Sequence, residues 1–260
     1  MKMPSSGLTR ALTLFLGLAA LSWSSSGARA DTIELRGDVW CPFNCEPNSD
    51  RPGFMVELAR EALAHYGHDV RYDTLTWSRS LDQTRSGEVN GVIGTDQDES
   101  PDLIFGPPLG TYQETLIFRG GEGRQIETVE DLDGLRIGVV VDYDYYPIFN
   151  TYITENERDP TRVQIIGGDD ALKRNLLKLT SGRIDMTMDE RSVVNYTIGE
   201  LGLADQVELV PYEDASDLFI AFSPALESSQ IYAQQLSEGI ERLKASGRYA
   251  EILARYGLPG

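Results

Sequence analysis

Residues 86–94 read Ser-Gly-Glu-Val-Asn-Gly-Val-Ile-Gly, and residues 181–189 read Ser-Gly-Arg-Ile-Asp-Met-Thr-Met-Asp. Each stretch combines the end of a helix, a Ser-Gly turn and a short apolar strand. Helices and strands alternate on both sides of each stretch, which is typical of β-α-β units on a mostly parallel sheet. Because the flanking elements also correspond, the repeat favours two similar α/β lobes over one large sheet.

The first series of elements surrounds the first of these stretches. Alternating apolar residues predict strands, and apolar residues at helical spacing predict helices, one of them capped by Ser78. The expected strands are residues 32–36, 70–75 and 89–94, and the expected helices are residues 53–66 and 78–86. We expect the pattern to break at Pro101, Pro107 and Pro108, because proline interrupts regular structure.

The same series starts again after a strand at residues 115–118. Its expected elements are a short helix capped by Thr128 with Asp131 at its third position, strands at 136–141, 163–166 and 184–188, and helices at 146–156 and 171–181. A strand at 217–222, followed by helices at 230–246 and 248–256, indicates that the chain returns to the first lobe. We therefore divide the chain into lobe 1, residues 31–118 and 219–260, and lobe 2, residues 119–218, joined by a double-stranded hinge near Phe118 and Phe219.

Residues 1–30 are typical of a signal peptide. They have a positively charged start, an apolar run from Ala11 to Leu21 that is too short to span a bilayer, and a small-x-small cleavage site at residues 28–30. No cysteine lies near that site, so we expect no lipid anchor. The sequence predicts a soluble, monomeric protein that starts at Asp31 and is exported to a bacterial periplasm.

The chain is strongly acidic, with 23 basic and 41 acidic residues. Cleavage after residue 30 would remove three of the basic residues and no acidic one, which raises the excess of acids further. Nucleic acid and anionic membrane surfaces are therefore excluded as partners. A solvated acidic surface accounts for most of this charge.

Cys41 and Cys45 lie in a loop, residues 38–47, that follows the first expected strand. In an exported protein such a pair is expected to form a disulfide rather than a redox or metal pair. A metal site would need further ligands, and the two histidines lie together near a helix end, so we expect no metal and no cofactor. Trp40 and Phe43 in the same loop either form an aromatic wall for a ligand or cap the core.

Six short segments, in this order along the chain, resemble the bacterial extracellular solute-binding proteins of family 3. They are residues 40–43, 53–59, 86–93, 131–139, 181–185 and 243–249. The Cys-Pro-Phe-Asn-Cys loop resembles a subgroup that is often found without an obvious permease partner. The resemblance implies a two-lobed periplasmic binding protein (type II) that captures a small polar solute by hinge closure and delivers it to a membrane transporter.

The resemblance also implies the positions of ligand-binding residues at the strand ends of both lobes. Trp40 and Trp77 would flank the ligand, Gly94 and Thr95 would bind it after the third strand, and either Asp189 or Glu190 would bind its amine. The remaining expected site residues are Phe43 and Asp96 in lobe 1 and Asp142, Tyr143, Asp144 and Tyr145 in lobe 2.

The chain departs from the family pattern at residues 95–102. Amino-acid binders carry an arginine there, which grips the ligand carboxylate with two parallel hydrogen bonds. This segment has no arginine and several acids. An ordinary α-amino acid is therefore in doubt, and Arg79 either substitutes for the missing arginine or is a solvated residue of its helix. The acids and aromatic residues at the strand ends favour an amine-bearing or cationic solute.

Two other function classes remain as alternatives. An enzyme on the same scaffold, such as a dehydratase, would need catalytic groups, but the sequence has no nucleophile motif and no histidine near a strand end. We therefore expect a protein that is not an enzyme. A ligand-sensing partner of a signalling membrane protein is not distinguished from a transport protein by the sequence.

Overall fold

The computed structural model describes Met1 and residues 30–259. The expected signal peptide, residues 1–30, lies outside the described residues except at its two ends. Within the described part of the chain, no helix is both long enough and apolar enough to cross a membrane.

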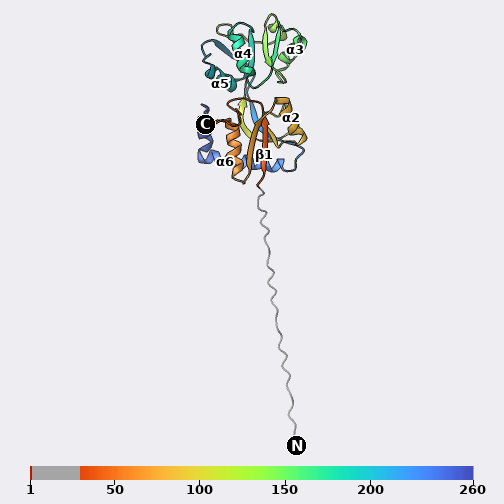
Figure 1. Cartoon of the computed structure of the whole chain (residues 1–260), viewed down its shortest axis with the longest axis vertical. Helices are drawn as coiled ribbons and strands as arrows, with labels where there is room; N and C mark the ends of the chain where they lie inside the picture. Colours follow the sequence, from red (N-terminus) through yellow and green to blue (C-terminus); the bar gives the residue numbers. More distant parts are fainter. Residues whose placement is uncertain (2–29, 260) are drawn as a thin grey trace.

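Two lobes lie end to end along the long axis of the molecule, and each contains one five-stranded sheet flanked by helices (Figure 1). The elements of lobe 1 are β1 (Thr32–Gly37), α1 (Phe54–Ala64), β2 (Asp69–Thr74), α2 (Trp77–Ser86), β3 (Gly91–Thr95), β4 (Ile104–Tyr112), β10 (Ser216–Phe222), α6 (Ser229–Ser246) and α7 (Arg248–Ala254). The elements of lobe 2 are β5 (Glu114–Arg119), the short 3-10 helix η1 (Val129–Leu132), β6 (Ile137–Val140), α3 (Pro147–Asn156), β7 (Val163–Ile166), α4 (Ala171–Thr180), β8 (Met186–Glu190), α5 (Arg191–Leu201) and β9 (Val207–Pro211).

The two sheets have equivalent topologies. The strand order is β2-β1-β3-β10-β4 in lobe 1 and β7-β6-β8-β5-β9 in lobe 2. In lobe 1, β1 is parallel to β2 and β3, whereas β10 is antiparallel to both of its neighbours. In lobe 2, β6 is parallel to β7 and β8, and β5 is antiparallel to both of its neighbours. Each sheet is therefore parallel except for one reversed strand, the strand by which the chain enters that lobe from the other.

The Ser-Gly repeat has a physical basis in both lobes. Gly87 ends α2 in the left-handed conformation, with φ 78°, and Gly182 follows α4 with φ 73°. A glycine adopts this conformation without the steric cost that a side chain would add, and the chain then turns into the next strand. The turns precede β3 and β8, which occupy corresponding central positions in the two sheets.

The lobe boundaries differ from those expected. β5 pairs within the second sheet, so residues 115–118, which we assigned to lobe 1, belong to lobe 2. β10 pairs within the first sheet from Ser216 onward, so residues 216–218 belong to lobe 1. The chain thus crosses between the lobes at Gln113 and returns between β9 and β10. β5 and β10, the strands that follow the two crossings, pair with strands of the lobe that the chain enters. Their local sequence does not show which strands they pair with.

Three further local predictions were wrong. β4 includes Pro107 and Pro108, which are accommodated because β4 is an edge strand, where one side of the backbone needs no partner. α5 and β9 were not predicted. α2 begins at Trp77, with Thr76 rather than Ser78 at the capping position. The predicted capping pair of η1 is present, because the Asp131 carboxylate accepts a 2.9 Å hydrogen bond from the backbone N–H of Thr128.

Candidate functional site

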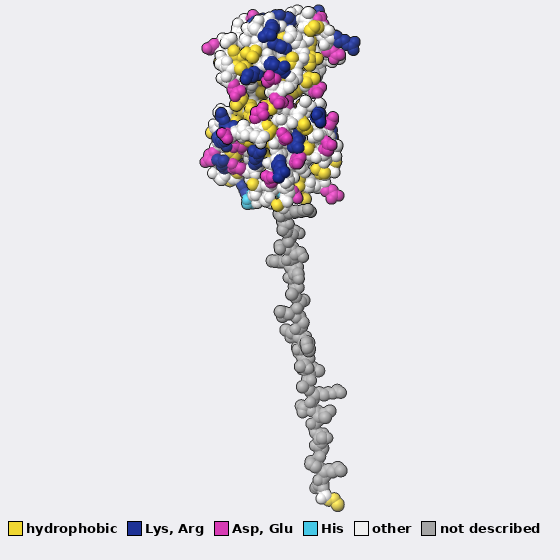
Figure 2. Space-filling model, in the orientation of Figure 1, with side chains coloured by type: hydrophobic (Ala, Val, Ile, Leu, Met, Phe, Trp, Pro, Cys, Tyr) yellow, Lys and Arg dark blue, Asp and Glu magenta, His cyan; other side chains and the backbone are white. Residues whose placement is uncertain are grey.

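A cavity of about 360 Å³ lies between the lobes, at the carboxyl ends of the parallel strands. We call it the first cavity. Figure 2 shows that acidic and hydrophobic side chains gather at the waist of the molecule, where the two lobes meet. The cavity is lined by Asp38, Trp40, Trp77, Ile93, Gly94, Asp96, Asp98, Glu99, Tyr112, Tyr143, Asp144, Tyr145, Tyr146, Pro147, Asp189, Ser216 and Leu218.

The structure brings most of the expected site residues together around the first cavity. Trp40, Trp77, Gly94, Asp96, Tyr143, Asp144, Tyr145 and Asp189 line it. Five others do not line it. Phe43 is buried beneath Trp40, Thr95 is buried, Arg79 is exposed on α2, Asp142 is exposed after β6, and Glu190 is buried at the start of α5.

The loop at residues 38–47 holds Trp40 in place. Cys41 and Cys45 form a disulfide, and the backbone N–H of Trp40 donates a 2.7 Å hydrogen bond to the carbonyl of Asn44. The Trp40 ring stacks on Phe43 with 4.8 Å between ring centroids. The backbone of Gly94 also lies against the ring, and a Cβ added there would come within 3.3 Å of the indole. The loop therefore presents a rigid aromatic surface to the cavity.

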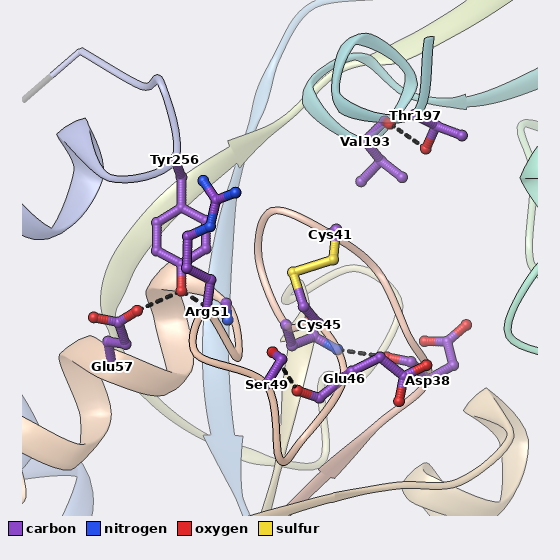
Figure 3. Close-up of a disulfide and its surroundings, with 12 residues drawn as sticks. Asp38, Cys41, Cys45, Glu46, Ser49, Arg51, Glu57, Val193, Thr197 and Tyr256 are labelled. Atoms are coloured by element: carbon purple, nitrogen blue, oxygen red, sulfur yellow. Dashed lines mark hydrogen bonds between the residues drawn. A yellow bond between two sulfur atoms is a disulfide. The ribbon is translucent and has the colours of Figure 1, made fainter. Parts of the chain in front are cut away.

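The disulfide of this loop faces the other lobe. Figure 3 shows Cys41 directed toward Val193 and Thr197 of α5. All three residues border a second space between the lobes.

Three hydrogen bonds between residues distant in sequence join the lobes next to the first cavity. The Trp40 indole Nε1 donates to Asp189 Oδ1 at 2.8 Å, and the Tyr143 hydroxyl donates to Asp38 Oδ2 at 2.5 Å. At the rim, Ser78 Oγ donates to Asp142 Oδ2 at 3.0 Å. Asp142 has φ 65°, in the left-handed region that aspartate tolerates better than most residues. Side chains from both lobes thus complete the walls of the cavity.

Asp189 and Glu190 are adjacent but face different surroundings. The Asp189 side chain is 4% exposed, and its Oδ1 also accepts the backbone N–H of Glu190 at 2.8 Å. Its Oδ2 accepts no hydrogen bond from the described residues. Glu190 instead caps α5, and its carboxylate accepts the backbone N–H groups of Ser192 and Val193 at 2.6 and 3.0 Å. Burial raises the pKa of both carboxyl groups to about 7.

Asp38, Asp98 and Glu99 also line the cavity, although they are not among the expected site residues. Glu99 accepts the Trp77 indole Nε1 at 2.7 Å and the Thr95 hydroxyl at 3.1 Å, so it orients the second tryptophan. Burial raises the pKa of Glu99 and raises that of Asp38 to about 6. Both positions lie in segments that we singled out, the first loop and the segment without arginine. Their sequence gave no sign of which acids point inward.

Another buried acid, Glu114, lies behind the cavity, where the chain first crosses between the lobes. The Tyr112 hydroxyl donates to Glu114 Oε2 at 2.6 Å, and burial raises the pKa of Glu114 to about 8. The nearby charges of Asp189 and Glu190 raise it further. A neutral Glu114 next to the cavity is compatible with its burial, since an ionised carboxylate there has no basic partner.

The charge of the first cavity is unbalanced. Six of its lining residues are acids, six are aromatic, and no arginine, lysine or histidine of the described chain lines it. Among the described residues there is also no cluster of three or more His, Cys, Asp or Glu side chains arranged to hold a metal ion. The cavity offers carboxylate oxygens and aromatic faces, which are the groups that bind an organic cation.

Comparison with known proteins identifies the fold and the family. The model of the bacterial extracellular solute-binding proteins, family 3, matches residues 36–259. A comparison with curated protein sequences finds no match. The chain is similar in structure to a protein from work on glutathione import and the cystine ABC importer of Streptococcus mutans, with 17% identity, a TM-score of 0.71, and coverage of 89% of this chain and 97% of that one.

Two other solved structures share this fold. One is an ancestral arginine-binding protein bound to arginine, with 17% identity, a TM-score of 0.67, and coverage of 86% of this chain and 97% of that one. The other is a histidine kinase sensor domain with similarity to periplasmic binding proteins, with 22% identity, a TM-score of 0.67, and coverage of 88% of this chain and 98% of that one.

Proposed function

This chain belongs to the bacterial extracellular solute-binding proteins, family 3, and we propose that it captures a small amine-bearing or cationic solute that lacks a carboxylate. The two lobes close on the solute about the crossings at Gln113 and between β9 and β10. The protein acts in the periplasm as a monomer and delivers the solute to a membrane transporter. It is a binding protein rather than an enzyme.

The observation that carries this proposal is the composition of the first cavity, which has six acids and no basic side chain of the described chain. An anionic group in this confined space would meet like charges with no compensating partner. A cationic group would instead be attracted by the carboxylates. Contact with the faces of Trp40 and Trp77 would add about 0.5 to 2 kcal/mol per good cation–π contact.

A sensory role is the alternative, because a histidine kinase sensor domain has the same fold. Transport and sensing use the same capture step and differ in the membrane partner. The neighbouring genes discriminate between them, since a permease with an ATPase favours transport and a histidine kinase or cyclase favours signalling.

The proposal is tested with pairs of solutes that differ only in a carboxylate. By titration calorimetry, tyramine should bind at least about tenfold more tightly than tyrosine, and agmatine more tightly than arginine, because the amines avoid placing a carboxylate among acids. Small-angle scattering on the same samples should show a more compact molecule when the amine is bound. Tight binding of glutamate, or equal binding within each pair, would show that the cavity does not select against carboxylates.

A further inference from the structure

A second cavity of about 560 Å³ adjoins the first. The two cavities share the four side chains of Asp38, Trp40, Tyr143 and Asp189, which we call the shared wall. The disulfide loop of lobe 1 forms one side of the second cavity, and residues at the start of α4 and along α5 in lobe 2 form the other. Its charged lining residues beyond the shared wall are Glu46, Asp50, Arg51, Asp169, Asp170, Lys173 and Glu200.

The shared wall exists only while the lobes are together. It consists of two hydrogen-bonded pairs, Trp40 with Asp189 and Tyr143 with Asp38, and each pair has one member in each lobe. When the lobes separate, both pairs break and the two cavities become one continuous cleft. A long solute can therefore enter the open cleft sideways and lie across both cavities when the lobes close, without passing through the wall.

Acids from both lobes face each other across the second cavity. The side chains of Glu46 in lobe 1 and Asp169 in lobe 2 accept no hydrogen bond from the described residues, and both are exposed. The charges of both raise the pKa of Tyr72, and the charge of Asp169 also raises that of Asp38 across the lobe boundary. The two acids thus act on the same small region of the cleft.

The basic residues of the second cavity do not neutralise these acids. Arg51 is exposed and donates from Nη1 to the carbonyl of Arg255 at 3.0 Å, and Lys173 is exposed on α4. Asp170 differs from Asp169, because it is paired with Arg174 at 2.9 Å. Glu46 and Asp169 therefore form no ion pair within the described residues, although Arg51 and Lys173 line the same cavity.

The second observation that points to a ligand is Asp189. Its carboxylate is 4% exposed and lines both cavities. Oδ1 accepts hydrogen bonds from Trp40 and from the backbone of Glu190, whereas Oδ2 accepts none from the described residues. Asp189 Oδ2 is not one of the fully enclosed oxygens without a partner, so a donor of a solute that enters the cavities can reach it. Its position in the shared wall directs that donor to the junction of the two cavities.

We propose that the second cavity takes the second positive charge of a linear dicationic solute whose first charge lies in the first cavity. Asp189 then lies at the junction between the two charges, and Glu46 and Asp169 flank the second one. This inference rests on the proposed function, because it assumes that the first cavity takes a cation. The solute class is an α,ω-diamine or a related molecule with a cationic group at each end.

The test compares cadaverine with pentylamine, which has the same carbon chain but a single amine. Titration calorimetry should give at least about tenfold tighter binding for cadaverine. Asp169→Asn and Glu46→Gln should each weaken cadaverine binding severalfold and change pentylamine binding much less, because both acids lie outside the first cavity. Glu227→Gln is the matched control, because the substitution removes the same unit of charge. Glu227 is exposed and lines neither cavity.

The outcomes separate the two proposals. Equal binding of the two amines, or tighter cadaverine binding that is insensitive to both substitutions, overturns the role of the second cavity and leaves the cationic first cavity standing. A loss of cadaverine affinity in the Glu227→Gln control equal to that in the other variants also overturns it, because the effect is then one of net charge. Failure of tyramine, agmatine, pentylamine and cadaverine all to bind overturns both proposals.

Discussion

Asp189 and Glu190 show that a difference of one residue decides which acid faces the cavity. The sequence predicted an acid for the ligand amine at one of these positions but did not choose between them. β8 ends at this point, so Asp189 still faces the cavity while Glu190 turns to cap α5. The choice depends on where the strand ends and the helix begins, and α5 was not recognised because its β-branched and glycine residues have weak helical propensity.

Replacement of Asp189 should separate binding from stability. Asp189→Asn keeps an oxygen acceptor for the Trp40 indole but removes the charge, so it should weaken agmatine binding by about tenfold or more. Because burial raises the pKa of Asp189 to about 7, the folded protein at about pH 8 carries this carboxylate ionised at an energetic cost that the unfolded chain does not have. The variant should therefore gain on the order of a few kcal/mol of stability at that pH.

Glu190→Gln is the matched control for Asp189→Asn, since the two acids are adjacent, buried and have similarly raised pKa values. At about pH 8 it also removes a costly buried charge, but the weakened cap of α5 offsets this gain, so it should stabilise the protein less than Asp189→Asn does and change agmatine affinity much less. Calorimetry and urea denaturation of both variants give the two readouts. An equal loss of affinity at the two positions would contradict the different roles that the structure gives them.

The disulfide loop is the element that could be predicted best from the sequence. Two prolines indicated an irregular segment, and one cysteine pair in an exported chain indicated a disulfide, which the structure contains. The position of the loop against the second lobe was not predictable, because it depends on residues far along the chain, such as Asp189, which is 149 positions from its hydrogen-bond donor Trp40. Local sequence thus predicted the disulfide but not which residues of lobe 2 the loop contacts.

The double substitution Cys41→Ser and Cys45→Ser should affect stability moderately and binding more clearly. Cross-linking residues with a sequence separation of only 4 restricts the unfolded chain little, so the free energy of unfolding should fall by about 2 kcal/mol. Trp40 lies in the same loop and would lose part of its fixed orientation, so agmatine affinity should also fall. Urea denaturation and calorimetry measure the two effects.

Treatment of the unmutated protein with a reductant should reproduce both effects, and the same reductant should leave the double variant unchanged. Alkylation and mass measurement of unreduced protein provide the covalent control. Recovery of two free thiols there would contradict the disulfide itself, and a double variant that binds agmatine as tightly as the unmutated protein would show that Trp40 does not need the cross-link.

At the scale of the whole molecule, the order of short segments along the chain was sufficient to predict two α/β lobes with two connections between them. The lobe boundaries were not, because β5 and β10 pair with strands that are distant in sequence. β4 was missed for a related reason. Its prolines argue against a strand until its place at the edge of the sheet is known. Strand order is a property of the assembled sheet rather than of any window of residues.

The buried carboxyl groups between the lobes should make the stability of the unliganded protein depend on pH. Burial raises the pKa of Asp38 to about 6, of Asp189 and Glu190 to about 7, and of Glu114 to about 8. In the unfolded chain such groups titrate near about pH 4. Between these values the folded protein binds more protons than the unfolded chain, so stability is highest at low pH in this window and falls as the pH rises.

Asp185 contributes a stability with the opposite pH dependence, but this contribution changes only below this pH window. Arg136 holds the pKa of Asp185 well below its usual range, so the stability from that carboxylate is lost only in strong acid. Urea denaturation should therefore give a free energy of unfolding that decreases by several kcal/mol from about pH 5.5 to about pH 8.5, with a smaller decrease in Asp189→Asn. Constant or rising stability across this range would contradict the burial of these groups.

Amine binding should have the reverse pH dependence, because a cation interacts best with ionised carboxylates. Agmatine affinity should rise between about pH 5.5 and about pH 8.5 as Asp38 and Asp189 lose their protons, and binding near neutral pH should release protons. Calorimetry in buffers with different ionisation enthalpies measures that release directly. A solute whose affinity falls with rising pH, or that binds with proton uptake, would show that these carboxyl groups meet the solute as neutral hydrogen-bond donors rather than as charges.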